Sequence, residues 1–302
     1  MKLGQRRLAP EEMYPAGEGG VNARMLDLHS GIRVRIVEAG DVTSPPIVLV
    51  PGWGCSVWIF HENIVALAAA GFRVVAVDPK GHGLSGKPRP PSEYTANAMR
   101  DNLLEILDAL QFERAGLVGH SMGAAIVAQA AERSPNRVSR IVLVAPVGFA
   151  GVPGMWLLRA LTPSFSIPLL RSLAGRPVFR AILSLVYGSL RRASDRDVEE
   201  FYAPTQFPDF TRALRHLLHE FTWDAPFPKL RLPLLTIVGS KDFLSRPRDA
   251  GRYRGTEPGS APFIVEGAGH VIFDEAPESV NAALANFFKP ASMGEYIWKQ
   301  NE

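Results

Sequence analysis

The sequence contains one cysteine, Cys55, among its 302 residues, so no disulfide can form within the chain. It lacks the run of about 20 apolar residues that a membrane-spanning helix requires. Residues 1–20 also lack the apolar centre of a signal peptide. The net charge is only +3, and the charges alternate in sign over most of the chain, which does not indicate a nucleic-acid partner. We therefore expect a soluble, cytoplasmic protein.

The apolar residues, 46% of the chain, are grouped in short runs that are typical of buried strands. Residues 23–30 and 32–40 alternate apolar with polar and predict a hairpin. Six apolar runs follow, at 47–50, 74–77, 115–119, 140–145, 233–238 and 262–267. Helical patterns separate most of them, at 58–71, 95–112, 122–135 and 277–288. This alternation predicts an α/β protein with a mostly parallel, eight-stranded sheet and helices on both faces.

One long interval interrupts the alternation of strands and helices. Residues 147–229 look helical and are broken by prolines, so we predict a helical cap inserted after the sixth strand. The α/β core then comprises residues 23–146 and 230–290. Residues 1–22 are predicted to form a flexible arm, and residues 291–302 a C-terminal tail.

The stretch LVGHSMGAA places Ser121 between Gly119 and Gly123, where a predicted strand gives way to a helix. A serine on so sharp a turn has a strained backbone, and flanking glycines relieve the crowding around it. This is the G-x-S-x-G nucleophile elbow. The N–H of Met122 would lie at the helix N-terminus, where negative charge is favoured.

A serine nucleophile needs a base, and the base needs an acid. His270 follows the last predicted strand, and Asp242 follows the strand before it, so both would reach the same sheet edge as Ser121. His120 is adjacent to the serine, but neighbours on such a turn point apart. His216 and His219 are three residues apart on a predicted helix, where a packed or solvated face is favoured over a metal pair.

The oxyanion of an acyl-transfer reaction needs a second backbone donor beside Met122. The loop PGWGCSVW follows the third predicted strand, and the N–H of Trp53, after Gly52, would face the pocket. We interpret Cys55 in the same loop as a packed small residue.

These features resemble the α/β-hydrolase superfamily over residues 24–288, and the resemblance implies the α/β-hydrolase fold. The segment DPKGHGLSGKP is similar to the family's D-x-x-G-x-G-x-S loop, which implies structural roles for Asp78, His82 and Ser85. Pro51 stands where many members have histidine. Family members that act on epoxides or haloalkanes have aspartate at the elbow, so Ser121 points to acyl transfer to water.

The predicted function is therefore a serine hydrolase that cleaves carboxylic esters with an apolar acyl or alcohol part through an acyl-serine, without cofactor or metal. Thioesters, lactones, amides and C–C bonds remain open as substrates. The alternative is a non-hydrolytic member of the fold: a ligand receptor, an accessory protein, or a cofactor-free oxygenase or lyase. The sequence leaves the oligomeric state open.

The cap segment 151–192 has six arginines and no acidic residue, with large apolar side chains between them. We expect its apolar residues to roof the pocket, and we predict that Gly52, His120 and Trp156 contact the substrate. The arginines suggest a contact with a membrane surface or an acidic carrier. A solvated helix surface is the alternative.

Overall fold

The computed structural model describes residues 7–147, 154–223, 230, 232–253 and 261–289, so the expected C-terminal tail lies outside the described residues. An eight-stranded sheet forms the centre, in the order β1-β2-β4-β3-β5-β6-β7-β8. Its strands are β1 Asn22–Asp27, β2 Arg33–Ala39, β3 Pro46–Val50, β4 Arg73–Asp78, β5 Ala115–His120, β6 Val138–Val144, β7 Leu234–Gly239 and β8 Phe263–Val265. β2 runs antiparallel to β1 and β4, and the other pairings are parallel. The predicted fold class is confirmed.

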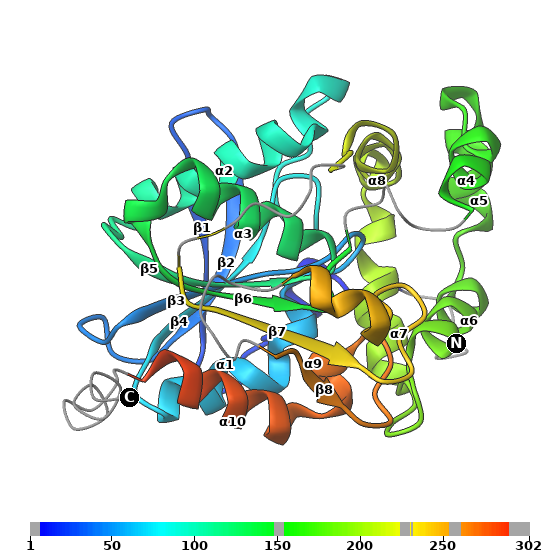
Figure 1. The fold of residues 1–302 in the computed structure, drawn as a ribbon. Helices are drawn as coiled ribbons and strands as arrows, with labels where there is room; N and C mark the ends of the chain where they lie inside the picture. The colour runs from blue at the N-terminus through cyan, green and yellow to red at the C-terminus, as the bar shows by residue number, and fades with distance from the viewer. Residues whose placement is uncertain (1–6, 148–153, 224–229, 231, 254–260, 290–302) are drawn as a thin grey trace, which may run out of the picture.

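Helices cover both faces of the sheet (Figure 1). In chain order they are α1 His61–Ala69, α2 Ala96–Ala109, α3 Met122–Arg133, α4 Met155–Leu161, α5 Ile167–Leu173, α6 Arg176–Val186, α7 Asp195–Tyr202, α8 Pro208–Glu220, α9 Ile272–Glu275 and α10 Pro277–Phe288. Short 3₁₀ turns include η1 Pro10–Glu12, η2 Val57–Phe60 and η7 Pro247–Arg252. α2 and α3 cover one face, while α1 and α10 cover the other.

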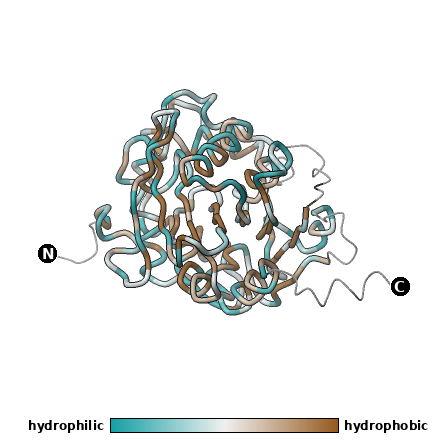
Figure 2. The backbone as a smooth tube through the Cα atoms, turned by 90° about the vertical axis from the view of Figure 1, so that its left-hand side faces the viewer, coloured by the Kyte–Doolittle hydropathy of each residue, from teal (hydrophilic) through white to brown (hydrophobic). Residues whose placement is uncertain are grey.

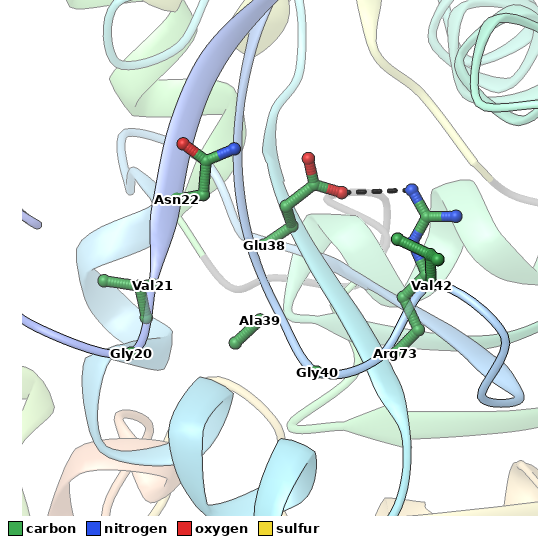
Figure 3. A pocket seen from close by; sticks show the side chains of 8 residues that line it. All are labelled: Gly20, Val21, Asn22, Glu38, Ala39, Gly40, Val42 and Arg73. Atoms are coloured by element: carbon green, nitrogen blue, oxygen red, sulfur yellow. Dashed lines mark hydrogen bonds and ion pairs between the residues drawn. The ribbon is translucent and has the colours of Figure 1, made fainter.

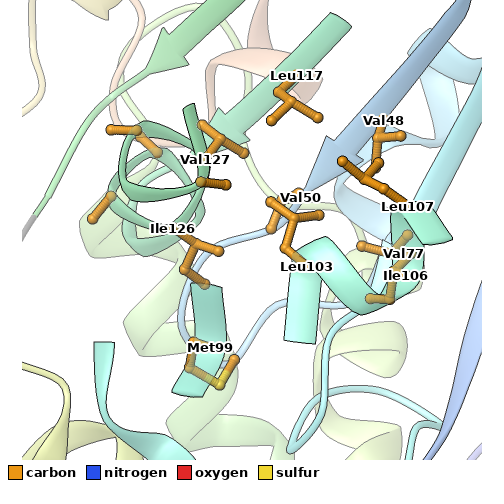
Figure 4. Packing of buried hydrophobic residues seen from close by; sticks show 14 of the residues in the cluster. Val48, Val50, Val77, Met99, Leu103, Ile106, Leu107, Leu117, Ile126 and Val127 are labelled. Carbon is orange, nitrogen blue, oxygen red and sulfur yellow. The ribbon is translucent and has the colours of Figure 1, made fainter. Parts of the chain in front are cut away.

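The strands are apolar on both sides because each side is covered by helices. β5 is buried along its whole length. Figure 4 shows Leu103, Ile106 and Leu107 of α2 packed beside Val48 and Val77 of the sheet. In Figure 2 the hydrophobic colour is accordingly concentrated in the interior of the molecule. A sheet fixed on both faces provides a rigid base for the loops at its carboxyl edge.

The expectation of a flexible N-terminal arm is wrong for part of that segment. Met13 and Tyr14 are each only 1% exposed. The Tyr14 N–H donates to the buried carboxylate of Glu200 at 2.8 Å, and the Tyr14 ring meets Trp58 edge-on. The segment is polar on average, but the two buried apolar residues and the hydrogen bonds of its backbone with Glu200, Arg35 and Arg196 hold it against the core and α7.

The cap comprises α4 to α8, which follow β6 and lie beyond the carboxyl ends of β5, β6 and β7 (Figure 1). Its arginines mostly make internal contacts. The Arg159 Nε donates to the carbonyl of Leu218 at 2.8 Å. Arg176 pairs with Glu199, Arg180 with Asp195, and Arg191 with Asp197 and Asp274. Four of the six arginines thus tie the cap together or to the core, and the expected contact with an anionic partner stays a prediction.

Candidate active site

Ser121 occupies the turn between β5 and α3 with φ +54° and ψ −118°, a conformation that non-glycine residues rarely adopt. The turn is crowded because strand and helix backbones approach closely. A Cβ on Gly119 would lie 2.3 Å from the carbonyl oxygen of Gly123. A Cβ on Gly123 would lie 2.3 Å from the carbonyl oxygen of Val50. The glycines therefore allow the packing that places the serine hydroxyl at the sheet edge.

This crowding predicts that Gly123→Ala is less stable than the wild type. We expect the variant to lose about 1–3 kcal/mol of unfolding free energy, because the added methyl overlaps the β3 backbone. Chemical denaturation followed by circular dichroism measures the change. Gly19→Ala is the matched control, since its Cβ would meet no atom within 4 Å. Equal stabilities for the two variants would contradict this account of the turn.

The structure brings the three predicted triad side chains together. The Ser121 Oγ lies 2.9 Å from the His270 Nε2, and the His270 Nδ1 lies 2.7 Å from the Asp242 Oδ2. The elements that carry them are far apart in sequence: Ser121 follows β5, Asp242 follows β7 and His270 follows β8. All three residues are less than 10% exposed. Parallel strands place these loops at one edge.

The surroundings of Asp242 favour the ionised form of its carboxyl group. Burial alone would raise its pKa, but the charge and hydrogen bond of His270 and the N–H groups of Ser245 and Leu244 lower the pKa below its ordinary value. The Asp242 Oδ1 accepts those two N–H groups at 3.0 and 2.8 Å. A lowered pKa in the folded state means that this group stabilises the fold above its ordinary pKa of about 3.9. That contribution is lost as the pH falls through the lowered value.

The loop predicted to supply the oxyanion donor lies directly against the elbow. A Cβ on Gly52 would be 2.8 Å from the Ser121 Cβ, so the loop and the serine touch. Met122 is the first residue of α3, where backbone N–H groups have no partner within the helix. The Trp53 side chain is 36% exposed, and its Nε1 donates to the carbonyl of Leu214 in α8 at 2.9 Å. That hydrogen bond ties the loop to the cap.

The structure corrects the predicted substrate contact of His120, while that of Trp156 stays a prediction. His120 is 1% exposed, and its Nε2 donates to the carbonyl of His270 at 2.8 Å. Its ring thus supports the loop of residues 266–271 between β8 and α9, which we call the histidine loop. Burial, followed by the nearby His270, lowers the pKa of His120 to about 3, and the ring stays neutral. Trp156 is 73% exposed on α4, the helix that also carries the exposed Leu161.

His216 and His219 face different surroundings. The His216 ring stacks on Tyr94 with centroids 5.5 Å apart, and the His219 Nε2 lies 3.0 Å from the carbonyl of Thr162. In the described ranges no three His, Cys, Asp or Glu side chains gather into a group that could hold a metal ion. Across the same ranges, no helix is long and apolar enough to cross a membrane.

The loop from Asp78 to Pro88 is a structural element beside the site. The buried Asp78 carboxylate accepts the N–H of Val57 at 2.8 Å and of Leu84 at 3.0 Å. Ser85 donates its hydroxyl to the carbonyl of Asp78 and accepts the N–H of Arg35. The Asp78 side chain thereby joins this loop to η2, which follows the loop that carries Trp53.

A separate pocket lies at the other end of the strands, where β2 ends and β4 begins (Figure 3). Its two charged side chains, Glu38 and Arg73, pair with each other at 3.2 Å. This pocket contains none of the three triad residues and is lined by Gly20, Val21, Asn22, Glu38, Ala39, Gly40, Val42 and Arg73.

A family model described as "alpha/beta hydrolase fold" matches residues 45–277, well over half of the chain. The chain belongs to this family. The matched range contains the elbow at Ser121 and the loops that carry Asp242 and His270 in this α/β hydrolase.

Individual relatives of this α/β hydrolase include enzymes of more than one kind. Epoxide hydrolase A of Mycobacterium tuberculosis is 27% identical over 323 residues, which cover 89% of this chain and 98% of the relative. The crystal structure of epoxide hydrolase A from Mycobacterium thermoresistibile is similar at 24% identity and TM-score 0.68, covering 89% and 98% of the two chains. A serine hydrolase involved in carbazole degradation reaches TM-score 0.74 at 20% identity, covering 88% and 98%. At such identities the structural matches show the fold alone, while the family model and the relative from Mycobacterium tuberculosis support a hydrolase.

Proposed function

We propose that this α/β hydrolase is a serine hydrolase of carboxylic esters with an apolar acyl or alcohol part. The observation that supports the proposal is the hydrogen-bonded series from Ser121 through His270 to Asp242, with 2.9 and 2.7 Å between the paired atoms. A hydroxyl, an imidazole and a carboxylate in this order are the components of nucleophilic acyl transfer. The series is buried beneath the cap and against the oxyanion loop.

In the proposed mechanism, the Ser121 Oγ attacks the ester carbonyl carbon while the His270 Nε2 takes its proton. The tetrahedral intermediate collapses, its bond to the alcohol oxygen breaks, and His270 returns the proton to the leaving alkoxide. The resulting acyl-serine is then attacked by water, which His270 deprotonates. The second intermediate releases the carboxylic acid and restores the Ser121 hydroxyl. Asp242 fixes the tautomer of His270 and stabilises its cation in both halves of the reaction.

The negative oxygen of each tetrahedral intermediate needs donors that are already in place. In this proposal, the N–H groups of Met122 and Trp53 supply them. The contact between Gly52 and Ser121 supports this assignment, because it fixes the loop that carries Trp53 against the nucleophile. The N-terminus of α3 adds a favourable dipole at the same point.

The relatives named as epoxide hydrolases make epoxide opening the second candidate. The identity of the nucleophile argues against it. Attack of a carboxylate on an epoxide leaves an ester, which water can hydrolyse at the carbonyl carbon. Attack by Ser121 would leave an ether, which has no carbonyl carbon for water to attack. A serine nucleophile is therefore suited to substrates that already contain a carbonyl group.

The apolar part of the substrate is inferred from the cap. Large apolar side chains on the cap helices are more than 40% exposed, among them Leu161, Phe165 and Leu169. Apolar surface of this extent favours contact with an apolar ligand over contact with water. We propose that it faces the acyl or alcohol chain as the substrate approaches Ser121. Thioesters, lactones and C–C bonds would use the same triad.

The proposal is tested with a substrate panel. We expect p-nitrophenyl esters to be hydrolysed, with kcat/KM rising from acetyl to medium acyl chains, and a fluorophosphonate probe to label the enzyme. An aryl epoxide offered under the same conditions should remain intact. Epoxide turnover without ester turnover would instead favour the second candidate. Folded protein that neither labels nor hydrolyses any ester, thioester or lactone would favour a non-hydrolytic member of the fold.

A further inference from the structure

The segment that follows α6 in the cap lies directly on the histidine loop. The His270 N–H donates to the carbonyl of Val186 at 2.8 Å, and the Ser189 N–H donates to the carbonyl of Gly267 at 2.8 Å. These hydrogen bonds join residues about 80 positions apart in the sequence. The backbone of the base in the proposed triad is therefore held partly by the cap.

Two glycines permit this contact. A Cβ on Gly188 would lie 2.4 Å from both the carbonyl oxygen of Gly267 and the nitrogen of Gly269. A Cβ on Gly269 would lie 2.4 Å from the nitrogen of Gly188 and 2.5 Å from the oxygen of Val186. The two segments pack backbone against backbone, and a side chain at either glycine would force them apart.

One carboxylate bridges the two segments. The Glu275 Oε2 accepts the N–H of Gly188 at 2.7 Å, and its Oε1 accepts the N–H of Gly269 at 2.9 Å. Glu275 is the last residue of α9 and is 6% exposed. A buried carboxylate whose two oxygens bind two different segments holds their separation fixed.

We propose that Glu275 is a positioning residue for His270, because it ties segment 186–189 of the cap to the histidine loop and so makes the cap and the base move together. The proposal rests on the proposed function of His270. His120 completes the arrangement from the opposite side, since its Nε2 holds the His270 carbonyl at 2.8 Å. The loop is thus held by the cap at its N–H and by the core at its C=O.

This arrangement makes the geometry of the base depend on the cap. Displacement of segment 186–189 would withdraw the Val186 carbonyl and the Glu275 bridge at once. The His270 Nε2 would then lose its 2.9 Å contact with the Ser121 Oγ. Small displacements of a catalytic group are costly, of the order of 100-fold in rate for about 1 Å.

The test is Glu275→Gln with Glu278→Gln as the matched control, because Glu278 lies three residues further on and is exposed. Glutamine has one acceptor oxygen, so its NH₂ group would oppose one of the two N–H donors. We expect fluorophosphonate labelling and kcat for esters to fall about 10- to 100-fold in Glu275→Gln, with KM nearly unchanged. The control should keep the wild-type rates.

Hydrogen exchange without substrate provides a second readout, which does not require activity. In Glu275→Gln, peptides covering residues 183–190 and 263–275 should both exchange faster than in the wild type and the control. Faster exchange in only one of the two segments, or wild-type exchange in both, would overturn the proposal. If the wild type is not labelled by the probe, the proposed function fails, and exchange alone decides the role of Glu275.

Gly188→Ala covers the case in which Glu275→Gln does not fold. Its methyl would separate the same two segments while the carboxylate remains. Labelling should slow and both peptides should again exchange faster. A folded Gly188→Ala that labels and exchanges like the wild type would overturn the proposal.

Discussion

Ser121→Ala is expected to lower kcat for ester hydrolysis on the order of 10⁴- to 10⁶-fold and to abolish labelling by a fluorophosphonate. The reason is that alanine removes the atom that forms the covalent bond, and no acyl-enzyme can then form. Alanine also fits the turn, because it removes only the Oγ from a residue whose Cβ is already accommodated. The variant should therefore retain its fold, as judged by circular dichroism and thermal unfolding.

Ser85→Ala is an informative control for this experiment. Ser85 is also buried and follows a glycine-rich stretch, but its hydroxyl binds the carbonyl of Asp78 and the N–H of Arg35. We expect this variant to lose stability and to keep its labelling per folded molecule. Labelling that persists in Ser121→Ala and disappears in Ser85→Ala would refute the assignment of the nucleophile.

The parts of the fold that depend on local pattern could be predicted from the sequence. Apolar runs such as residues 47–50 and 74–77 became β3 and β4, because strands covered on both faces can contain few polar residues. The elbow was recognisable because its strained turn demands glycine at positions 119 and 123. The order of Ser121, Asp242 and His270 placed all three at one edge, since parallel strands end together.

The parts that depend on tertiary packing could not be predicted in this way. Nothing in the polar N-terminal segment indicates that Tyr14 is buried, because its partner Glu200 lies in α7. The exposure of Trp156 depends on how α4 stands relative to the core. Glu275 follows His270 closely in the sequence, but its second partner, Gly188, is contributed by the cap. Contacts between the cap and the core depend on the tertiary fold, so the sequence around each residue gives little indication of them.

The same distinction applies to the electrostatics of the cap. An acid-free segment with six arginines suggests an exposed basic face when it is considered alone. Acidic partners lie in other segments, such as Glu199 and Asp195 in α7, and they pair with three of the six arginines. What the cap exposes instead is largely apolar, which is consistent with the proposed class of substrate.

Asp242→Asn is expected to lower kcat on the order of 10⁴-fold while leaving the fold intact. The Asp242 Oδ2 accepts a hydrogen bond from the N–H at the His270 Nδ1, with 2.7 Å between the two atoms. This tautomer leaves the Nε2 free to take the proton of Ser121. An asparagine can turn its NH₂ group toward the Nδ1 and so stabilise the opposite tautomer. The Nε2 would then already carry a proton, and the base could not act.

Asp249→Asn is the matched control, because Asp249 lies in η7 on the same connection between β7 and β8 and pairs with Arg246 at 2.7 Å. Its activity should equal that of the wild type. Steady-state kinetics with the best ester of the panel separates the two variants, and thermal unfolding at neutral pH confirms that both are folded. If Asp242→Asn kept most of its activity, then His270 would be oriented sufficiently by its backbone contacts with Val186 and His120. The carboxylate would then be dispensable for the tautomer, and the proposed division of roles within the triad would be wrong.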